Sequence, residues 1–349
     1  MHIATVAIDL AKSVFEVAAA DAAGRVIERK RLSRIQLEAY FQNRSADRIV
    51  MEACGSAHHW ARCFMARGFR VSLLPPHYVR AYVRRNKTDR ADASALLEAA
   101  RAPDIIEVRV KSLEQQAIQG LHRIRSAWKA TKTARINTLR GLCREFGVSA
   151  PSGVRRGLLE LSRRLAEEES GIPALVRSTM RLLLEEIVAL DAKLQAVERE
   201  LREVANQSAV CERLQTIPGV GLLTSTAFVG SVGDISGFKN ARRFSCWLGL
   251  TPREYSSGNI RRLGGISKRG DGYLRMLLIH GARAVLWSAS AARRAKKPLD
   301  ALRTSALELM TRHGHNKAAV AVANKLARIV WATWSRERVF ASREPTVLA

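Results

Sequence analysis

The chain has 349 residues, 47% hydrophobic and 26% charged, a mixture that excludes a disordered polyelectrolyte and indicates two or three folded domains. Lysine and arginine number 58 against 32 aspartate and glutamate residues, so the formal net charge is +26. A protein this basic is expected to meet a polyanion, and nucleic acid is the first candidate.

Membrane insertion and secretion are not expected. The longest uncharged run, residues 214–233, contains Gln, Ser, Thr, Pro and Gly and is too polar to span a bilayer. The N-terminal sequence has no basic start before its apolar stretch, unlike a signal peptide. The five cysteines are scattered without a CxxC pair, which predicts neither a zinc site nor a disulfide framework. We therefore expect the protein to reside in a reducing cytoplasm.

The first hundred residues alternate short apolar segments with helical ones. Strands are expected at 3–10, 14–20, 25–32, 48–54 and 70–74, and helices at 35–42, 57–67 and 89–100. The order βββαβαβα is that of a ribonuclease H-like fold, so we expect an α/β domain here.

Four carboxylates stand out in this part of the chain. Asp9 lies near the end of the first strand and Glu52 near the end of the fourth. Asp89 and Asp92 are three residues apart on a helix and therefore share one face. In a ribonuclease H-like sheet the first and fourth strands are neighbours and the last helix packs beside them, so all four acids can converge.

Clustered carboxylates suggest a site for divalent cations. Hard oxygen ligands suit Mg²⁺ or Mn²⁺, and two such ions roughly 4 Å apart can support phosphodiester chemistry. Each acid taken alone has a simpler explanation, as a loop cap or as a complement to the helix dipole.

Basic residues precede the acidic pair and are expected to contact the phosphate backbone. They are Arg80, Arg84, Arg85 and Lys87, and Lys12 after the first strand joins them. A solvated helix face is the alternative.

The middle of the chain is helical. Residues 112–146 form a long basic amphipathic helix, Pro151 to Gly153 interrupt it, and a second long helix is expected to run to about residue 205. Its apolar stripe alternates spacings of four and three, which predicts a coiled coil. The stripe is Val176, Met180, Leu183, Ile187, Leu190, Leu194, Val197, Leu201 and Val204. An antiparallel hairpin and a dimer seam fit equally well.

We expect the C-terminal part, residues 209–349, to be mainly helical. Residues 214–228 resemble a helix-hairpin-helix, which presents backbone N–H groups to phosphate, although a plain packing unit fits nearly as well. Residues 317–334 form an apolar core helix.

Residues 239–275 hold nine basic and two acidic residues. Ser256 and Ser257 there are either turn residues or a nucleophile in the positive field of nearby arginines. The basic residues expected to bind nucleic acid are Arg253, Arg261, Arg262, Lys268, Arg269 and Arg275.

The whole chain resembles the DEDD insertion-sequence transposases, the family numbered one-ten, which are in turn similar to Piv-type pilin-gene invertases. The N-terminal resemblance rests on VAIDLAKSVFEV, IVMEACGSAHHW and NKTDRADASALLEAA. The C-terminal resemblance rests on IPGVGLLTSTAFV, FSCWLGLTPREYSSGNIRRLGGISKRGDGYLR and HNKAAVAVANKLARIVW.

The resemblance implies three parts: a RuvC-like catalytic domain at 1–108, a coiled-coil linker at 109–208 and a C-terminal transposase domain at 209–349. The acids that match the family's metal tetrad are Asp9, Glu52, Asp89 and Asp92. Ser257, the serine before glycine in the PxxxxSG pattern, matches the family's serine nucleophile.

The implied activity is that of a Mg²⁺-dependent (or Mn²⁺-dependent) DNA transposase that joins strands through a phosphoserine link. The family also implies a homo-oligomer, a dimer or tetramer that shares its acids and serine across protomers, and for some members a structured bridge RNA as guide. The expected location is the bacterial cytoplasm, at the nucleoid. Two rivals stay open: a RuvC-like junction nuclease that uses water, and a non-enzymatic nucleic-acid-binding scaffold.

Overall fold

The computed structural model describes residues 2–83 and 88–341, and of Asp89 it describes the backbone but not the side chain. Two compact units are present, Met1–Ser112 and Leu113–Ala349. The expected boundary near residue 208, between linker and C-terminal domain, stays a prediction. No helix in the described part is long and apolar enough to cross a membrane.

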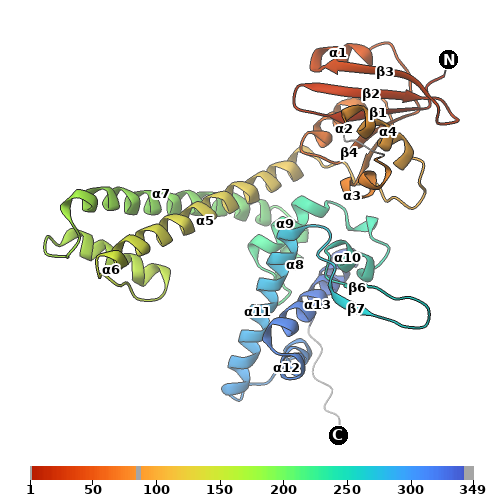
Figure 1. Cartoon of the computed structure of the whole chain (residues 1–349). Coiled ribbons are helices and arrows are strands. Elements are labelled where there is room, and N and C mark those ends of the chain that lie inside the picture. The colour runs from red at the N-terminus through yellow and green to blue at the C-terminus, as the bar shows by residue number, and fades with distance from the viewer. Residues whose placement is uncertain (1, 84–87, 342–349) are drawn as a thin grey trace, which may run out of the picture. The chain divides into compact units, whose positions relative to one another are not determined.

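The first unit is built on a five-stranded sheet of order β3-β2-β1-β4-β5 (Figure 1). The strands are β1 (Thr5–Leu10), β2 (Val14–Ala20), β3 (Val26–Ser33), β4 (Arg48–Glu52) and β5 (Val71–Leu74). Strands β1, β2 and β3 form an antiparallel meander, and β1 pairs in parallel with β4 and β4 with β5. This mixed sheet agrees with the expected ribonuclease H-like arrangement.

Helices cover both faces of the sheet because its strands bury alternate side chains on both sides. The helical segments are α1 (Arg34–Tyr40), α2 (Ala57–Ala66), α3 (Pro76–Val79), the 3₁₀ turn η1 (Arg80–Tyr82) and α4 (Asp89–Ala99). On one face Ile8 packs in a core with Trp60 and Phe64 of α2. On the other face Ala7 and Val50 pack in a core with residues of α4.

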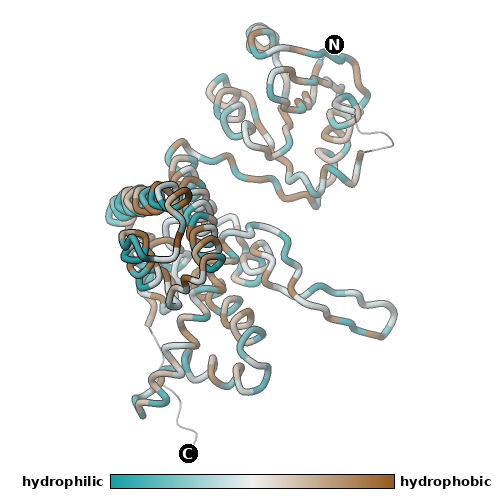
Figure 2. The backbone as a smooth tube through the Cα atoms, turned by 60° about the vertical axis from the view of Figure 1, so that its left-hand side comes forward, coloured by the Kyte–Doolittle hydropathy of each residue, from teal (hydrophilic) through white to brown (hydrophobic). Residues whose placement is uncertain are grey.

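The second unit contains two long helices, α5 (Leu113–Glu145) and α7 (Ala174–Asn206), which pack against each other. Ion pairs join them at Arg125–Glu198, Lys132–Asp191 and Arg135–Glu186. Residue numbers rise along α5 as they fall along α7, so the pair is antiparallel within one chain. Figure 2, in which this pair comes forward, shows both hydrophilic and hydrophobic residues on its coils.

The predicted apolar stripe of α7 lies largely buried in this pairing. Its buried members are Met180, Ile187, Leu190, Leu194, Val197 and Leu201. Of the two alternatives, the structure shows the antiparallel hairpin of α5 and α7 within one chain. Whether these two helices supercoil as a coiled coil stays a prediction.

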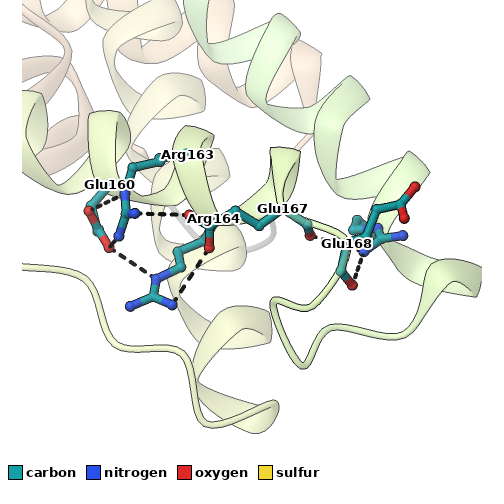
Figure 3. Close-up of polar contacts among 6 residues, drawn as sticks. Glu160, Arg163, Arg164, Glu167 and Glu168 are labelled. Carbon is teal, nitrogen blue, oxygen red and sulfur yellow. Dashed lines mark hydrogen bonds and ion pairs between the residues drawn. The ribbon is translucent and has the colours of Figure 1, made fainter.

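The expectation of one continuous second helix is wrong, because α6 (Val154–Ala166) ends before α7 begins. Glu167, Glu168 and Glu169 follow α6, where negative charge opposes the helix dipole. Gly171 has φ +76° and Pro173 is the N-cap of α7, so the chain turns between them. Figure 3 shows Arg163 and Arg164 near the end of α6, where both form ion pairs with Glu160 and Glu167.

The rest of the second unit is a helical bundle with one hairpin. Its elements are α8 (Ala209–Gln215), α9 (Leu222–Val232), η2 (Ile235–Gly237), α10 (Ala241–Trp247), β6 (Pro252–Glu254), β7 (Leu263–Ile266), α11 (Gly272–Arg294), α12 (Ala301–His313) and α13 (His315–Ser335). The expected C-terminal core helix is confirmed as α13, whose Val322, Leu326 and Val330 are fully buried.

The turn between α8 and α9 packs closely against α11. Gly219 has φ +85°, and a Cβ added there would lie 2.6 Å from the carbonyl oxygen of Gly281. Close backbone packing is sufficient reason for glycine in this turn. Phosphate binding by this helix-hairpin-helix-like segment stays a prediction.

Candidate active site

Asp9 and Glu52 lie next to each other at the carboxyl ends of two neighbouring strands. In the parallel pair of β1 and β4, Ile8 stands opposite Met51, and the two acids are the next residues along each strand. Ala7 and Val50, two positions earlier, face α4. Because side chains on a strand alternate, Asp9 and Glu52 project to this same side of the sheet.

Helix α4 crosses that side of the sheet. The Arg29 guanidinium of β3 donates to Ser94 Oγ at 2.9 Å, and that of Arg48 in β4 donates to the Ala100 carbonyl at 3.0 Å. The helix therefore runs from above β3 towards the start of β4.

Asp92 lies in the first turn of α4, four residues before Leu96, which packs into the core between the helix and the sheet. These two residues share a helix face. The backbone of Asp89 lies three residues earlier on this face, and its side chain is outside the described residues. Three of the four predicted carboxylates are thus directed into the layer between α4 and the sheet. Among the described side chains, no group of three or more His, Cys, Asp or Glu is gathered as a metal site.

Sequence reasoning missed Glu16. It stands directly opposite Asp9 in the pairing of β1 with β2, so both side chains are on one face. The short connection between these strands was a usable signal, because a tight hairpin nearly fixes which residues face each other.

The basic residues predicted near these acids are partly described. Lys12 is exposed in the turn after β1, and Arg80 is exposed at the start of η1. Arg84, Arg85 and Lys87 lie outside the described residues.

Ser257 lies at the tip of the β6–β7 hairpin. Its backbone N–H donates to the Ile260 carbonyl at 3.2 Å, and the Ile260 N–H donates back to the Ser257 carbonyl at 3.1 Å. These two bonds close a turn of Gly258 and Asn259, and Gly258 takes φ +54°, as such turns require. Ser257 is exposed and immediately precedes the turn.

The hairpin has two chemically different faces. The Tyr255 N–H donates to the Arg262 carbonyl at 2.9 Å, and a Cβ added to Gly264 would lie 3.5 Å from Cε2 of Tyr255. Alternation from these pairs gives what we call the Ser257 face: Arg253, Tyr255, Ser257, Ile260, Arg262 and Gly264. The other side, the Glu254 face, consists of Glu254, Ser256, Arg261 and Leu263.

On the Glu254 face, the charge of the Glu254 carboxylate is balanced by Arg261 of the same face. Glu254 Oε1 accepts hydrogen bonds from Ser256 Oγ at 2.8 Å and from Arg261 Nε at 3.2 Å. The Ser256 hydrogen bond and the positive charge of Arg261 lower the pKa of the Glu254 carboxyl. Ser256 Oγ also accepts from the Arg262 N–H at 3.2 Å. The Ser257 face, by contrast, carries two arginines and no acid.

The remaining basic candidates differ in their surroundings. Lys268 and Arg269 are exposed. Arg275 is half-buried and donates from Nη1 to the Leu248 carbonyl at 3.0 Å and to the Arg269 carbonyl at 3.4 Å. The Arg275 guanidinium thus ties two chain segments together.

Comparisons with known proteins agree with this architecture. Residues 211–297 match the family described as Transposase IS116/IS110/IS902 family, and residues 6–147 match the DEDD transposase domain of IS110 elements. A probable family 20 transposase of Pseudomonas aeruginosa is 41% identical over 97% of this chain and 99% of its own length. The transposase for insertion sequence element IS1111A of Coxiella burnetii is 41% identical over 95% and 90%. That for IS1328 of Yersinia enterocolitica is 34% identical over 97% and 99%.

The chain therefore belongs to the IS110 family of DEDD transposases, as the resemblance predicted. Membership in this family implies an enzyme that cuts and rejoins DNA and that uses divalent metal ions.

Proposed function

We propose that the chain moves its own insertion sequence by strand exchange in which Ser257 is the nucleophile and Asp9, Glu52, Asp89 and Asp92 hold Mg²⁺ or Mn²⁺. The observation that carries the proposal is the adjacency of Asp9 and Glu52 at the ends of β1 and β4, beneath the helix that bears Asp92. Four carboxylates form an all-oxygen donor set, which suits these ions. When bound, such an ion supplies Lewis-acid stabilisation of the charge that develops on phosphate oxygens.

The hairpin supports the role of Ser257. In the proposed step Ser257 Oγ attacks a DNA phosphorus, the bond from phosphorus to the 3′ oxygen breaks, and the serine proton leaves as that oxygen gains one. One phosphate ester replaces another, so a 3′ hydroxyl can later attack the phosphoserine and release the serine. Arg253 and Arg262 share the Ser257 face and would hold the phosphate and its developing charge.

Ser256 is the natural control because it neighbours Ser257 but lies on the Glu254 face. DNA that carries the ends of the element is incubated with Mg²⁺ and the full-length protein, and covalent adducts are scored on a denaturing gel. We expect Ser257→Ala to abolish the adduct while DNA binding persists, and Ser256→Ala to retain it. An adduct that survives in Ser257→Ala would remove this serine from the mechanism.

The carboxylates are tested in the same assay. Asp9→Asn and Glu52→Gln are expected to abolish adduct formation with the fold intact, whereas Asp47→Asn, an exposed acid that pairs with His2, should be neutral. Cut ends in wild-type reactions without any adduct would favour the junction nuclease that uses water. Full function of both carboxylate variants would favour the non-enzymatic scaffold.

Oligomer and guide RNA belong to the same proposal and rest on the family resemblance. If acids and serine act from different protomers, mixing Ser257→Ala protein with Asp9→Asn protein will restore part of the adduct. If a bridge RNA guides the reaction, the transcript of the flanking non-coding region will be needed for adduct formation at matched DNA sites.

A further inference from the structure

Tyr255 is an exposed aromatic residue on the Ser257 face of the hairpin. Its exposed fraction is 63%, and no described residue hydrogen-bonds its hydroxyl. It belongs to no core, since every described core cluster of its unit omits it. A tyrosine this exposed contributes little to the core of its unit, so its ring is available to a ligand.

The surroundings of Tyr255 leave its ring accessible. Gly264 is the diagonal neighbour of Tyr255 across the hairpin, and a Cβ added there would lie 3.5 Å from Cε2 and 3.9 Å from Cδ2 of the ring. Because glycine has no side chain, nothing from this neighbour covers the ring. Arg253 precedes it on the same face and Arg262 stands opposite it, so an arginine flanks Tyr255 on each side of this face.

An accessible aromatic ring between arginines is the chemistry that binds unpaired nucleic acid. Bases stack on aromatic side chains while basic groups follow the phosphates. Tyr255 and Ser257 are two residues apart on one arm of the hairpin, about 7 Å if this arm is extended, which places a stacked base within roughly one nucleotide of a phosphate at the serine.

We infer that Tyr255 stacks on an unpaired DNA base next to the phosphate that Ser257 attacks, and so positions that phosphate. The location of the phosphate rests on the proposed function, but stacking itself can be measured without catalysis. DNA rather than RNA is inferred because the hydroxyl beside Tyr255 is the proposed nucleophile for DNA.

The test compares Tyr255→Ala, Tyr255→Phe and Ile260→Ala in full-length Ser257→Ala protein. Ile260 is the matched control, because it is an exposed apolar residue on the same face without an aromatic ring. The probe is a single-stranded DNA oligonucleotide with 2-aminopurine, whose fluorescence falls on stacking, and its dissociation constant is measured across a salt series.

We expect Tyr255→Ala to weaken binding on the order of tenfold and to relieve the quenching of 2-aminopurine. The salt slope should stay unchanged, because stacking releases no counterions. Tyr255→Phe should bind as the parent does, and Ile260→Ala should change affinity less than about twofold.

Three results would overturn the inference: unchanged DNA binding in Tyr255→Ala, equal losses in Tyr255→Ala and Ile260→Ala, or a loss for an RNA oligonucleotide of the same sequence but not for DNA. With Ser257 intact, Tyr255→Phe should form the adduct at the wild-type rate, and failure to do so would make the hydroxyl, not the ring, the active feature. Adduct formation by the Ser257→Ala variant would sink the proposed function while leaving the stacking result standing.

Discussion

His122 of α5 is buried in a polar contact that links three helices, and its replacement should change the pH dependence of stability. Its side chain is 3% exposed, Nδ1 lies 3.0 Å from Tyr273 Oη of α11, and Nε2 lies 3.0 Å from Thr226 Oγ1 of α9. Thr226 Oγ1 donates its proton to the Leu222 carbonyl at 2.7 Å, so it accepts from Nε2–H of the neutral imidazole, and Nδ1 accepts from Tyr273 Oη. Burial, with a smaller contribution from Arg125, lowers the pKa of His122 from 6.5 to about 4.

The sign and size of the effect follow from this pKa. Between pH 6.5 and 4 the unfolded chain binds a proton at His122 and the folded chain does not, so stability falls as pH falls. The difference between 6.5 and about 4 corresponds to a loss of about 3 kcal/mol of folding stability once the pH is below 4, and of about 2 kcal/mol at pH 5.

His122→Gln removes the titration while keeping a donor and an acceptor. We expect the free-energy advantage of the wild type over this variant to shrink by about 2 kcal/mol between pH 7 and pH 5. Urea unfolding followed by tryptophan fluorescence suits the measurement, because five of the six tryptophans lie in Leu113–Ala349. His280→Gln, an exposed change on α11, is the control. A pH-independent gap, or an imidazole resonance of His122 that titrates near pH 6.5, would refute the burial argument.

The contact between the α8–α9 turn and α11 makes two further predictions. Gly219→Ala should destabilise the protein by about 2–4 kcal/mol, because the new Cβ would lie 2.6 Å from the Gly281 carbonyl oxygen at φ +85°. Gly281→Ala should cost a similar amount, since its Cβ would lie 2.1 Å from the Gly219 carbonyl oxygen. Gly221→Ala, with no atom within 4 Å of its Cβ, should cost less than about 1 kcal/mol, and thermal melting that ranks Gly221→Ala with the other two would contradict this packing.

Much of the fold was predictable because local patterns and tertiary structure agree. Strands β1 to β5 and helices α1, α2, α4 and α13 lie close to the expected ranges. Each of these segments has a clear hydrophobic periodicity and is bounded by residues that favour a turn or a helix end. The break between α6 and α7 was missed because Gly171 and Pro173 were not used as signals for a helix end and a helix start. The predicted apolar stripe begins only at Val176, so it did not show that the helix was continuous before that residue.

The sites were harder to predict because they depend on pairing between strands. Asp9 and Glu52 could be placed together only through a fold hypothesis, and Glu16 was missed because no register was assigned. Arg261 and Arg262 are adjacent residues of the same type, yet they lie on opposite faces of the hairpin. A shift of one residue decides which arginine joins Ser257 and which joins Glu254.

Glu254 restrains one of these arginines, and its neutralisation should strengthen DNA binding. Glu254→Gln keeps an acceptor for Ser256 Oγ but removes the charge that holds Arg261 at 3.2 Å. An exposed ion pair is weak, so a freed Arg261 is expected to raise DNA affinity by at most about fivefold. If Arg261 then contacts a phosphate, the salt slope should steepen by about one unit.

Glu308→Gln is the matched control for this change, because Glu308 is an exposed partner of Arg312 on α12 and its loss alters the net charge equally. Equal gains in both variants would assign the effect to net charge alone, since long-range attraction does not depend on where the charge is lost. No gain in either variant would mean that Arg261 does not reach DNA. A gain confined to Glu254→Gln would place nucleic acid on the Glu254 face as well, so that the hairpin would lie between DNA segments with its serine facing only one of them.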